Sequence, residues 1–200
     1  EPITTTDDAK RLIYSSVEGT VPGNFELDLY KAGLIGDPYF GANTLEMQKL
    51  ENLHLWYCRT FTFHGTADEN TFLRFEGIDT VAEIYLNGKL LQKVSNMFLT
   101  YEIPVPDLID GENDLVVHIL PATIAVREHA IPVSANALKY NYESLYIRKA
   151  ASMYGWDIMP RIVSAGIWRP VSLIQKTADR IDDVFIYPLR ANEHHAALSV

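Results

Sequence analysis

Residues 71–94 read TFLRFEGIDTVAEIYLNGKLLQKV, and this stretch contains the clearest signal for β-structure in the chain. At its centre, Asn87-Gly88 separates a run in which apolar and polar residues alternate from a second apolar run. Both residues of such a pair tolerate the positive φ of a type I′ turn, so the pair predicts a tight β-hairpin. The β-branched and aromatic run over residues 71–76 predicts a further strand just before it.

Similar short runs lie on both sides of this hairpin. They predict further strands over residues 56–63, 98–103, 115–119, 171–175, 184–189 and 196–200. Turn residues recur between these runs, which favours a β-sandwich or barrel over a fold of alternating strands and helices.

Helical segments are expected to be few and short. Residues 7–17 predict one helix, and residues 25–32 predict a second one that ends at Gly33. Residues 121–154 contain no clear strand and are expected to form long ordered loops, which are usually functional.

Composition excludes several classes of protein. The 200 residues are 48% apolar and 22% charged, as in an ordinary globular domain. The net charge of −9 argues against a nucleic-acid or anionic-membrane partner, because binding phosphate needs a basic face. Cys58 is the only cysteine and the histidines are scattered, so we expect no disulfide, no metal site and no cofactor.

The chain begins at Glu1 rather than Met, as a processed protein or a piece of a longer one would. It contains one thiol and no Asn-x-Ser/Thr sequon. These features favour a periplasmic or secreted protein of the bacterial envelope.

Four groups of motifs, in this order, resemble the N-terminal sugar-binding domain of family 2 glycoside hydrolases, and most of all that of the β-mannosidases. The first is Val21-Pro22-Gly23 with Asp28-Leu29 and Ala32 to Tyr39, and the second is Trp56 to Phe61. The third is Phe75 to Ala82 with Tyr85-Leu86-Asn87-Gly88 and Asn96-Met97-Phe98. The fourth is Ile147 to Ala150 with Tyr154-Gly155-Trp156-Asp157 and Gly166-Ile167-Trp168-Arg169-Pro170. The resemblance covers roughly residues 20–175.

The resemblance implies an all-β chain with a jelly-roll-like β-sandwich and a short helical segment near the N-terminus. It divides the chain into a sugar-binding sandwich over residues 1–177 and the first strands of a truncated immunoglobulin-like domain over residues 178–200. In the family a catalytic barrel follows, so we expect no catalytic residue in this chain. A retaining glycosidase needs two carboxyl groups about 5–5.5 Å apart, and no local motif here selects such a pair.

By the same resemblance, Asp157 is the residue expected to bind substrate, with Trp156 beside it. A loop carboxylate can accept hydrogen bonds from two neighbouring hydroxyls of a terminal, mannose-like sugar. Arg148, Lys149 and Arg161 flank this loop, and one of them is expected to support Asp157 by pairing with it; alternatively, all three are solvated charges.

One departure from the β-mannosidase pattern leaves the sugar open. After Gly-Trp-Asp the family usually continues Trp-Gly-Pro, whereas this chain has Ile158-Met159-Pro160. The same domain from a β-galactosidase or an exo-glucosaminidase therefore stays possible. A stand-alone carbohydrate-binding module that uses its Tyr- and Trp-rich loops, or a purely structural domain, are further alternatives.

Three further residues are expected to lie in the protein interior and not in a binding site. Trp56 and Trp168 lie in or beside predicted strands and are expected to pack in the core. Cys58 is expected to be a small buried hydrophobic residue.

Overall fold

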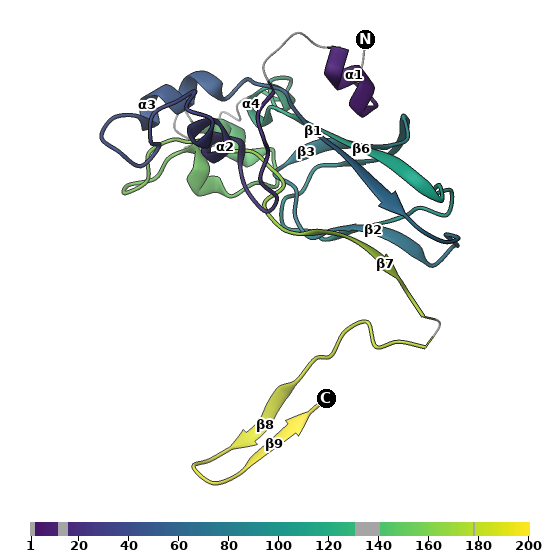
Figure 1. The fold of residues 1–200 in the computed structure, drawn as a ribbon. Helices are drawn as coiled ribbons and strands as arrows, with labels where there is room; N and C mark the ends of the chain where they lie inside the picture. Colours follow the sequence, from purple (N-terminus) through teal and green to yellow (C-terminus); the bar gives the residue numbers. More distant parts are fainter. Residues whose placement is uncertain (1–2, 12–15, 131–140, 178) are drawn as a thin grey trace.

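The protein is a β-sandwich made of two antiparallel sheets, which lie face to face in Figure 1. The computed structural model describes residues 3–11, 16–130, 141–177 and 179–200. The first sheet has the order β1 (Leu55–Phe63), β6 (Gly111–Leu120), β3 (Val81–Leu86), β4 (Lys89–Val94). The second has the order β5 (Tyr101–Pro104), β2 (Thr71–Phe75), β7 (Val171–Gln175). The expected all-β, jelly-roll-like sandwich is confirmed.

The core lies between the two sheets. Alternate side chains of the strands point into it, and among them Phe75 and Ile84 are completely buried. Burying a side chain of this size contributes about 1.5–3 kcal/mol, so these inward rows supply most of the driving force for stacking the sheets.

The predicted hairpin is confirmed at Asn87-Gly88. Its two residues have φ angles of 50° and 78°, as a type I′ turn requires. The Asn87 side chain also fastens the turn to β6, because its Nδ2 donates to Asn113 Oδ1 at 2.9 Å and its Oδ1 accepts from Asp114 N at 2.8 Å.

The helices are short, and most of them gather at one end of the sandwich (Figure 1). They are α1 (Thr6–Arg11), α2 (Phe25–Lys31), α3 (Thr44–Met47), η1 (Gln48–Leu50), α4 (Ala122–Ala125), η2 (Tyr142–Leu145) and η3 (Ala151–Tyr154). The predicted helix at 25–32 is confirmed: Asn24 Oδ1 accepts from Leu27 N at 3.1 Å, and Gly33 follows the helix with φ +71°.

Other boundaries differ from the predictions. The helix expected over residues 7–17 ends at Arg11; residues 16 and 17 are not helical, and 12–15 lie outside the described residues. The strand expected from Phe98 begins only at Tyr101, because Asn96 Oδ1 accepts from Phe98 N at 2.9 Å and holds a turn there. The segment 121–154 contains α4, η2 and η3 as well as loops.

Two interior assignments were wrong. Trp56 is 38% exposed and Cys58 is also exposed. Side chains alternate along β1, and one face of its sheet packs on the core; Leu55 and Tyr57 occupy that face, so Trp56 and Cys58 point outward. Trp168 is half-buried, and its Nε1 donates to Met97 O at 3.1 Å.

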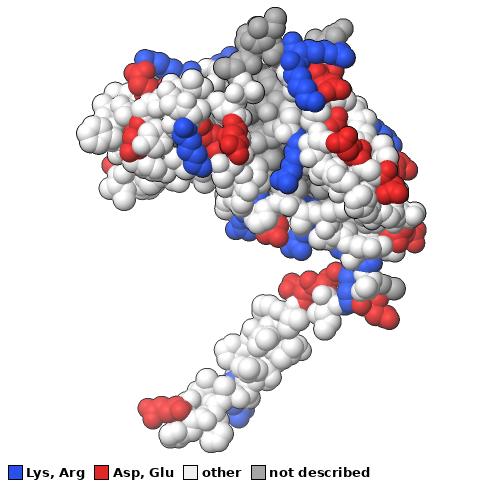
Figure 2. All heavy atoms as spheres, in the orientation of Figure 1, with Lys and Arg blue, Asp and Glu red and all other residues white. Residues whose placement is uncertain are grey.

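The last two strands stand apart from the sandwich. β8 (Tyr187–Ala191) and β9 (Ala196–Ser199) pair with each other, and among the described residues neither joins the larger sheets. Figure 1 shows this hairpin projecting beyond β7, and Figure 2 shows that its visible surface is almost free of charged side chains. Leu189 and Leu198 are 56% and 55% exposed there, so apolar surface is left uncovered.

Candidate functional site

The predicted binding residues lie at the tip of the loop between η3 and β7. Gly155, with φ +104°, provides a conformation at the end of η3 that other residues rarely adopt. Trp156 N donates to Met159 O at 3.0 Å and Met159 N donates to Trp156 O at 3.1 Å. Asp157 and Ile158 therefore occupy the middle of a closed turn, where both are exposed.

A cavity of about 330 Å³, open to solvent, adjoins this turn. It is lined by Asn141, Tyr154, Gly155, Trp156, Asp157, Met159 and Arg161. Among the described residues of this lining, Asp157 is the one carboxylate, and its side chain has no hydrogen bond or ion pair to any of the residues that the structure describes. Its oxygens are thus available to a ligand, and the Trp156 side chain beside it is also largely exposed.

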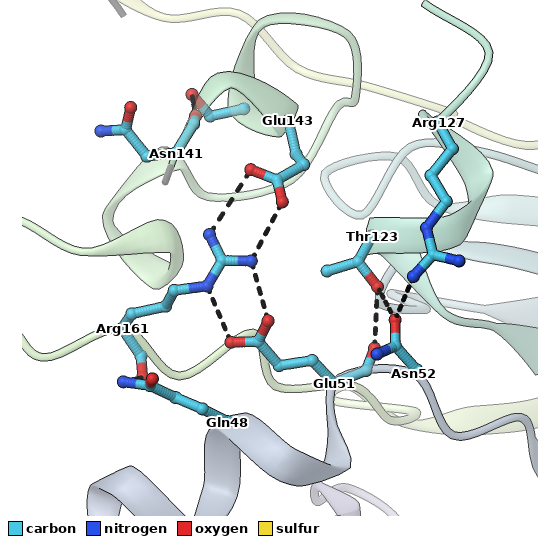
Figure 3. A network of polar contacts seen from close by, with 9 residues as sticks. Gln48, Glu51, Asn52, Thr123, Arg127, Asn141, Glu143 and Arg161 are labelled. Atoms are coloured by element: carbon cyan, nitrogen blue, oxygen red, sulfur yellow. Dashed lines mark hydrogen bonds and ion pairs between the residues drawn. The ribbon is translucent and has the colours of Figure 1, made fainter. Parts of the chain in front are cut away.

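Arg161 fastens the return half of the loop, as Figure 3 shows. Its Nε and one terminal nitrogen donate to the two carboxylate oxygens of Glu51, both at 2.8 Å. Glu143 in η2 accepts two further bonds, at 3.1 and 3.4 Å. The planar guanidinium suits such forked contacts, so Arg161 joins three segments that are far apart in the sequence.

Lys149 fastens the base of the same loop from inside the protein. Its side chain is fully buried, and its Nζ lies 2.5 Å from both carboxylate oxygens of Asp79 and also donates to Ser164 O. Asp79 and Gly166 exchange backbone hydrogen bonds of 2.9 and 3.2 Å. Both ends of the loop are therefore held against the segment that precedes β3.

Glu26 of α2 completes this buried network. It is 4% exposed, and its Oε2 accepts from Ser164 Oγ at 2.8 Å. Burial raises the pKa of Glu26 to about 7, although the Ser164 hydroxyl and the nearby Lys149 ammonium oppose the rise. Burial also lowers the pKa of Lys149, against the attraction of the Asp79 carboxylate.

The structure places the five predicted site residues in different environments. Asp157 and Trp156 line the cavity together with Arg161. The idea that Lys149 pairs with Asp157 or is solvated was wrong, because it is buried against Asp79. The carboxylates that Arg161 contacts in Figure 3 are Glu51 and Glu143, so it is not a solvated charge either. Arg148 has an exposed side chain, and its backbone O accepts from Met97 N at 3.0 Å.

Sequence reasoning missed the acidic partners of these cations, namely Glu51, Glu143, Asp79 and Glu26. Lys149 and Asp79 are 70 positions apart, and Arg161 and Glu51 are 110 apart. An acidic residue at such a separation carries no local signal that it forms a buried pair. Asp79 and Lys149 do lie inside the family-like motifs Phe75 to Ala82 and Ile147 to Ala150, but these motifs do not indicate that the two residues form a pair.

Neither a metal centre nor a membrane span is found among the described residues. No three or more His, Cys, Asp or Glu side chains in the described ranges converge in a way that could hold a metal ion. No helix in that part of the chain has the length and apolar character needed to cross a bilayer.

Known proteins of similar sequence include several β-mannosidases. The curated relatives include a probable β-mannosidase of Caenorhabditis elegans, 32% identical over 163 residues, which are 74% of this chain and 18% of the relative. Another is β-mannosidase B of Aspergillus clavatus, 31% identical over 187 residues, 88% of this chain and 22% of the relative. This chain therefore spans about a fifth of their length.

A solved structure is similar over most of the chain. The crystal structure of a β-D-mannosidase from Dictyoglomus thermophilum matches with a TM-score of 0.80 and 35% identity, over 90% of this chain and 23% of that one. The family model described as "Glycosyl hydrolase 2 galactose-binding domain-like" matches residues 3–169, which is most of the sandwich. The chain is thus a member of the galactose-binding-like domain family of the family 2 glycoside hydrolases.

Proposed function

We propose that this chain is the non-catalytic N-terminal domain of an exo-acting, β-mannosidase-like glycosidase. In this role the sandwich braces a catalytic barrel encoded beyond residue 200, and the Asp157 loop contributes to the pocket that recognises the terminal β-linked sugar. The observation that carries the proposal is Asp157 itself. It is an exposed carboxylate without a partner among the described residues, on a loop that Lys149 and Arg161 hold in place.

The cavity suits binding better than bond cleavage. Hydrolysis of a glycoside by the usual routes needs a pair of carboxyl groups, and the described lining of the cavity offers Asp157 alone. Each hydrogen bond to a charged acceptor contributes about 1.5–3 kcal/mol of binding free energy, so a carboxylate that accepts from two hydroxyls can fix the position of a sugar ring. Trp156 beside it offers an apolar face to the C–H groups of the same ring.

The relatives support the choice of sugar and of domain arrangement. The proteins that align over most of this chain are named β-mannosidases, and about four fifths of each lies outside the aligned part. An exo-chitosanase of Amycolatopsis orientalis, 16% identical with a TM-score of 0.55, shares the fold alone. We therefore favour a mannoside over a glucosaminide or galactoside as the substrate.

The first test is Asp157→Ala in the complete gene product, assayed with an aryl β-mannoside. We expect kcat/KM to fall at least about tenfold, because losing one charge-assisted hydrogen bond costs more than about 1.4 kcal/mol. Asp107→Ala is the matched control, since the Asp107 side chain is 84% exposed and lies outside the cavity. A fall of less than about threefold would contradict the assignment.

The second test asks whether the 200-residue chain has catalytic activity of its own. The purified 200-residue chain is expected not to hydrolyse the same substrate, and measurable turnover would overturn the proposal. So would a gene that ends shortly after Val200 without encoding a catalytic domain.

We also propose a domain boundary near residue 177, with residues 178–200 beginning an immunoglobulin-like domain. Support comes from the isolated pairing of β8 with β9 and from the uncovered apolar side chains of this hairpin. Hydrogen exchange is the test: backbone amides in β8 and β9 should exchange much faster than those in β6. Equal protection in both would place the hairpin in the same cooperative unit as the sandwich.

A further inference from the structure

A row of four side chains crosses the outer face of the first sheet. Trp56 of β1 lies opposite His118 of β6, His118 lies opposite Glu83 of β3, and Glu83 lies opposite Lys93 of β4. Their strand neighbours, such as Leu55 and Ile84, point into the core, so the row points away from it. Adjacent strands are about 4.8 Å apart, and the row therefore extends over about 14 Å.

Contacts along the row hold the Trp56 ring in one orientation. The rings of Trp56 and His118 stack with their centres 4.3 Å apart and an angle of 5° between planes. His118 is held in turn, because its Nε2 lies 2.9 Å from His54 Nδ1 and its Nδ1 lies 3.5 Å from Glu83 Oε2. Glu83 Oε1 is 2.5 Å from Lys93 Nζ. A ring fixed in this way loses little entropy when a ligand stacks on it.

The two ends of the row are accessible. Trp56 is 38% exposed although its ring stacks on His118, and the Lys93 side chain is 68% exposed. His118 and Glu83, in the middle of the row, are more buried, with side-chain exposures of 15% and 22%. None of these residues lines the Asp157 cavity, and none has a role in the proposed function.

The chemistry of the row matches an uncharged ligand. Burial lowers the pKa of His118, which leaves the imidazole neutral near pH 7, and the charges of Glu83 and Lys93 cancel. Polar groups remain free for a ligand at both ends, namely the other N–H groups of Lys93 and the second ring nitrogen of His54. An aromatic face flanked by neutral and charge-balanced hydrogen-bonding groups suits pyranose rings, which combine apolar C–H faces with hydroxyl rims.

We propose that the sheet-face row (Trp56, His118, Glu83 and Lys93) is a second saccharide-binding site, which takes a short neutral chain of hexopyranoses. One ring stacks on Trp56, and the chain continues across the strands toward Lys93. This site is separate from the Asp157 cavity, so the two proposals share no residue and fail independently.

The test is a titration of the 200-residue chain with mannotriose and with cellotriose, followed by calorimetry and by the NMR signals of the indole N–H groups. We expect the Trp56 signal to move on binding and Trp56→Thr to weaken binding at least about tenfold, since the central aromatic anchor dominates such sites. Lys93→Ala should weaken it less. Phe98→Ala is the matched control and should bind as the parent does, because Phe98 is a 59% exposed aromatic residue outside the row.

Several results would overturn the proposal. These are no binding of either trisaccharide at millimolar concentration, unchanged binding by Trp56→Thr, or loss of binding by Asp157→Ala instead. A dimer in sedimentation that Trp56→Thr converts to a monomer would assign the row to protein contacts and also overturn it. If Trp56→Thr does not fold, Trp56→Phe replaces it. This variant keeps a smaller ring, so if it binds each trisaccharide as tightly as the parent does, stacking on the indole is contradicted.

Discussion

Replacing Glu26 by Gln should remove a large part of the pH dependence of folding. Glu26 is buried, and its carboxyl group accepts from Ser164 Oγ while facing the ammonium of Lys149 and the carboxylate of Asp79. Gln has nearly the same shape and can keep the bond to Ser164, but it never ionises. The substitution therefore isolates the cost of the buried charge from the cost of lost packing.

The sign and size of the effect follow from linkage. The pKa of Glu26 rises from 4.5 to about 7 on folding, mainly through burial. Between these values the folded state keeps a proton that the unfolded chain has released, so the stabilisation from Glu26 is complete below pH 4.5 and is lost as the pH rises to about 7. Each pH unit corresponds to about 1.4 kcal/mol, which gives a total of about 3 kcal/mol over this range.

Urea denaturation of the parent and of Glu26→Gln between pH 4.5 and pH 8, followed by tryptophan fluorescence, measures this effect. The free energy of unfolding of the variant minus that of the parent should rise by about 3 kcal/mol across the range and then level off. Glu69→Gln, an exposed carboxylate in the loop before β2, is the matched control and should give a nearly flat difference. A flat difference for Glu26→Gln as well would contradict the raised pKa of Glu26, because it would mean that Lys149 fully compensates the charge.

Three more substitutions test the ties that hold the loop. Lys149→Met should destabilise the fold by about 3–5 kcal/mol in urea denaturation at pH 7, because it leaves the buried Asp79 carboxylate unpaired; a loss below about 1 kcal/mol would contradict this. Arg161→Lys should lower the free energy of unfolding by about 1–3 kcal/mol and speed hydrogen exchange over residues 154–161, since a single ammonium cannot replace the forked contacts to Glu51 and Glu143. Unchanged exchange would show that the loop is held by other contacts. Gly166→Ala should lower stability by about 1–3 kcal/mol, because its Cβ would lie 2.5 Å from a backbone oxygen of the segment before α2; a melting temperature equal to the parent's would argue against that close approach.

We also propose that the protein is exported to the bacterial envelope, and locating the gene product in cell fractions would test this.

Patterns in the sequence were reliable where the structure is local. Alternation with a period of two predicted the strands of both sheets, and Asn87-Gly88 predicted the hairpin, because both depend on backbone geometry within a few residues. The same reasoning failed for Trp56 and Cys58. An aromatic or apolar residue in a strand can face the core or the solvent, and only the register of β1 against β6 in the folded sandwich decides between them.

The β-sandwich, its family and the loop that presents Asp157 can thus be predicted from the order of the residues. The tertiary structure was needed to find what holds that loop, since Lys149 meets Asp79 across 70 positions and Ser164 meets Glu26 across 138. It also decided which faces of the strands remain open, and so brought Trp56 and Lys93 into one row. The reason is physical: hydrophobic periodicity is a property of neighbouring residues, whereas a buried ion pair forms only where packing has already brought two distant segments together and excluded water.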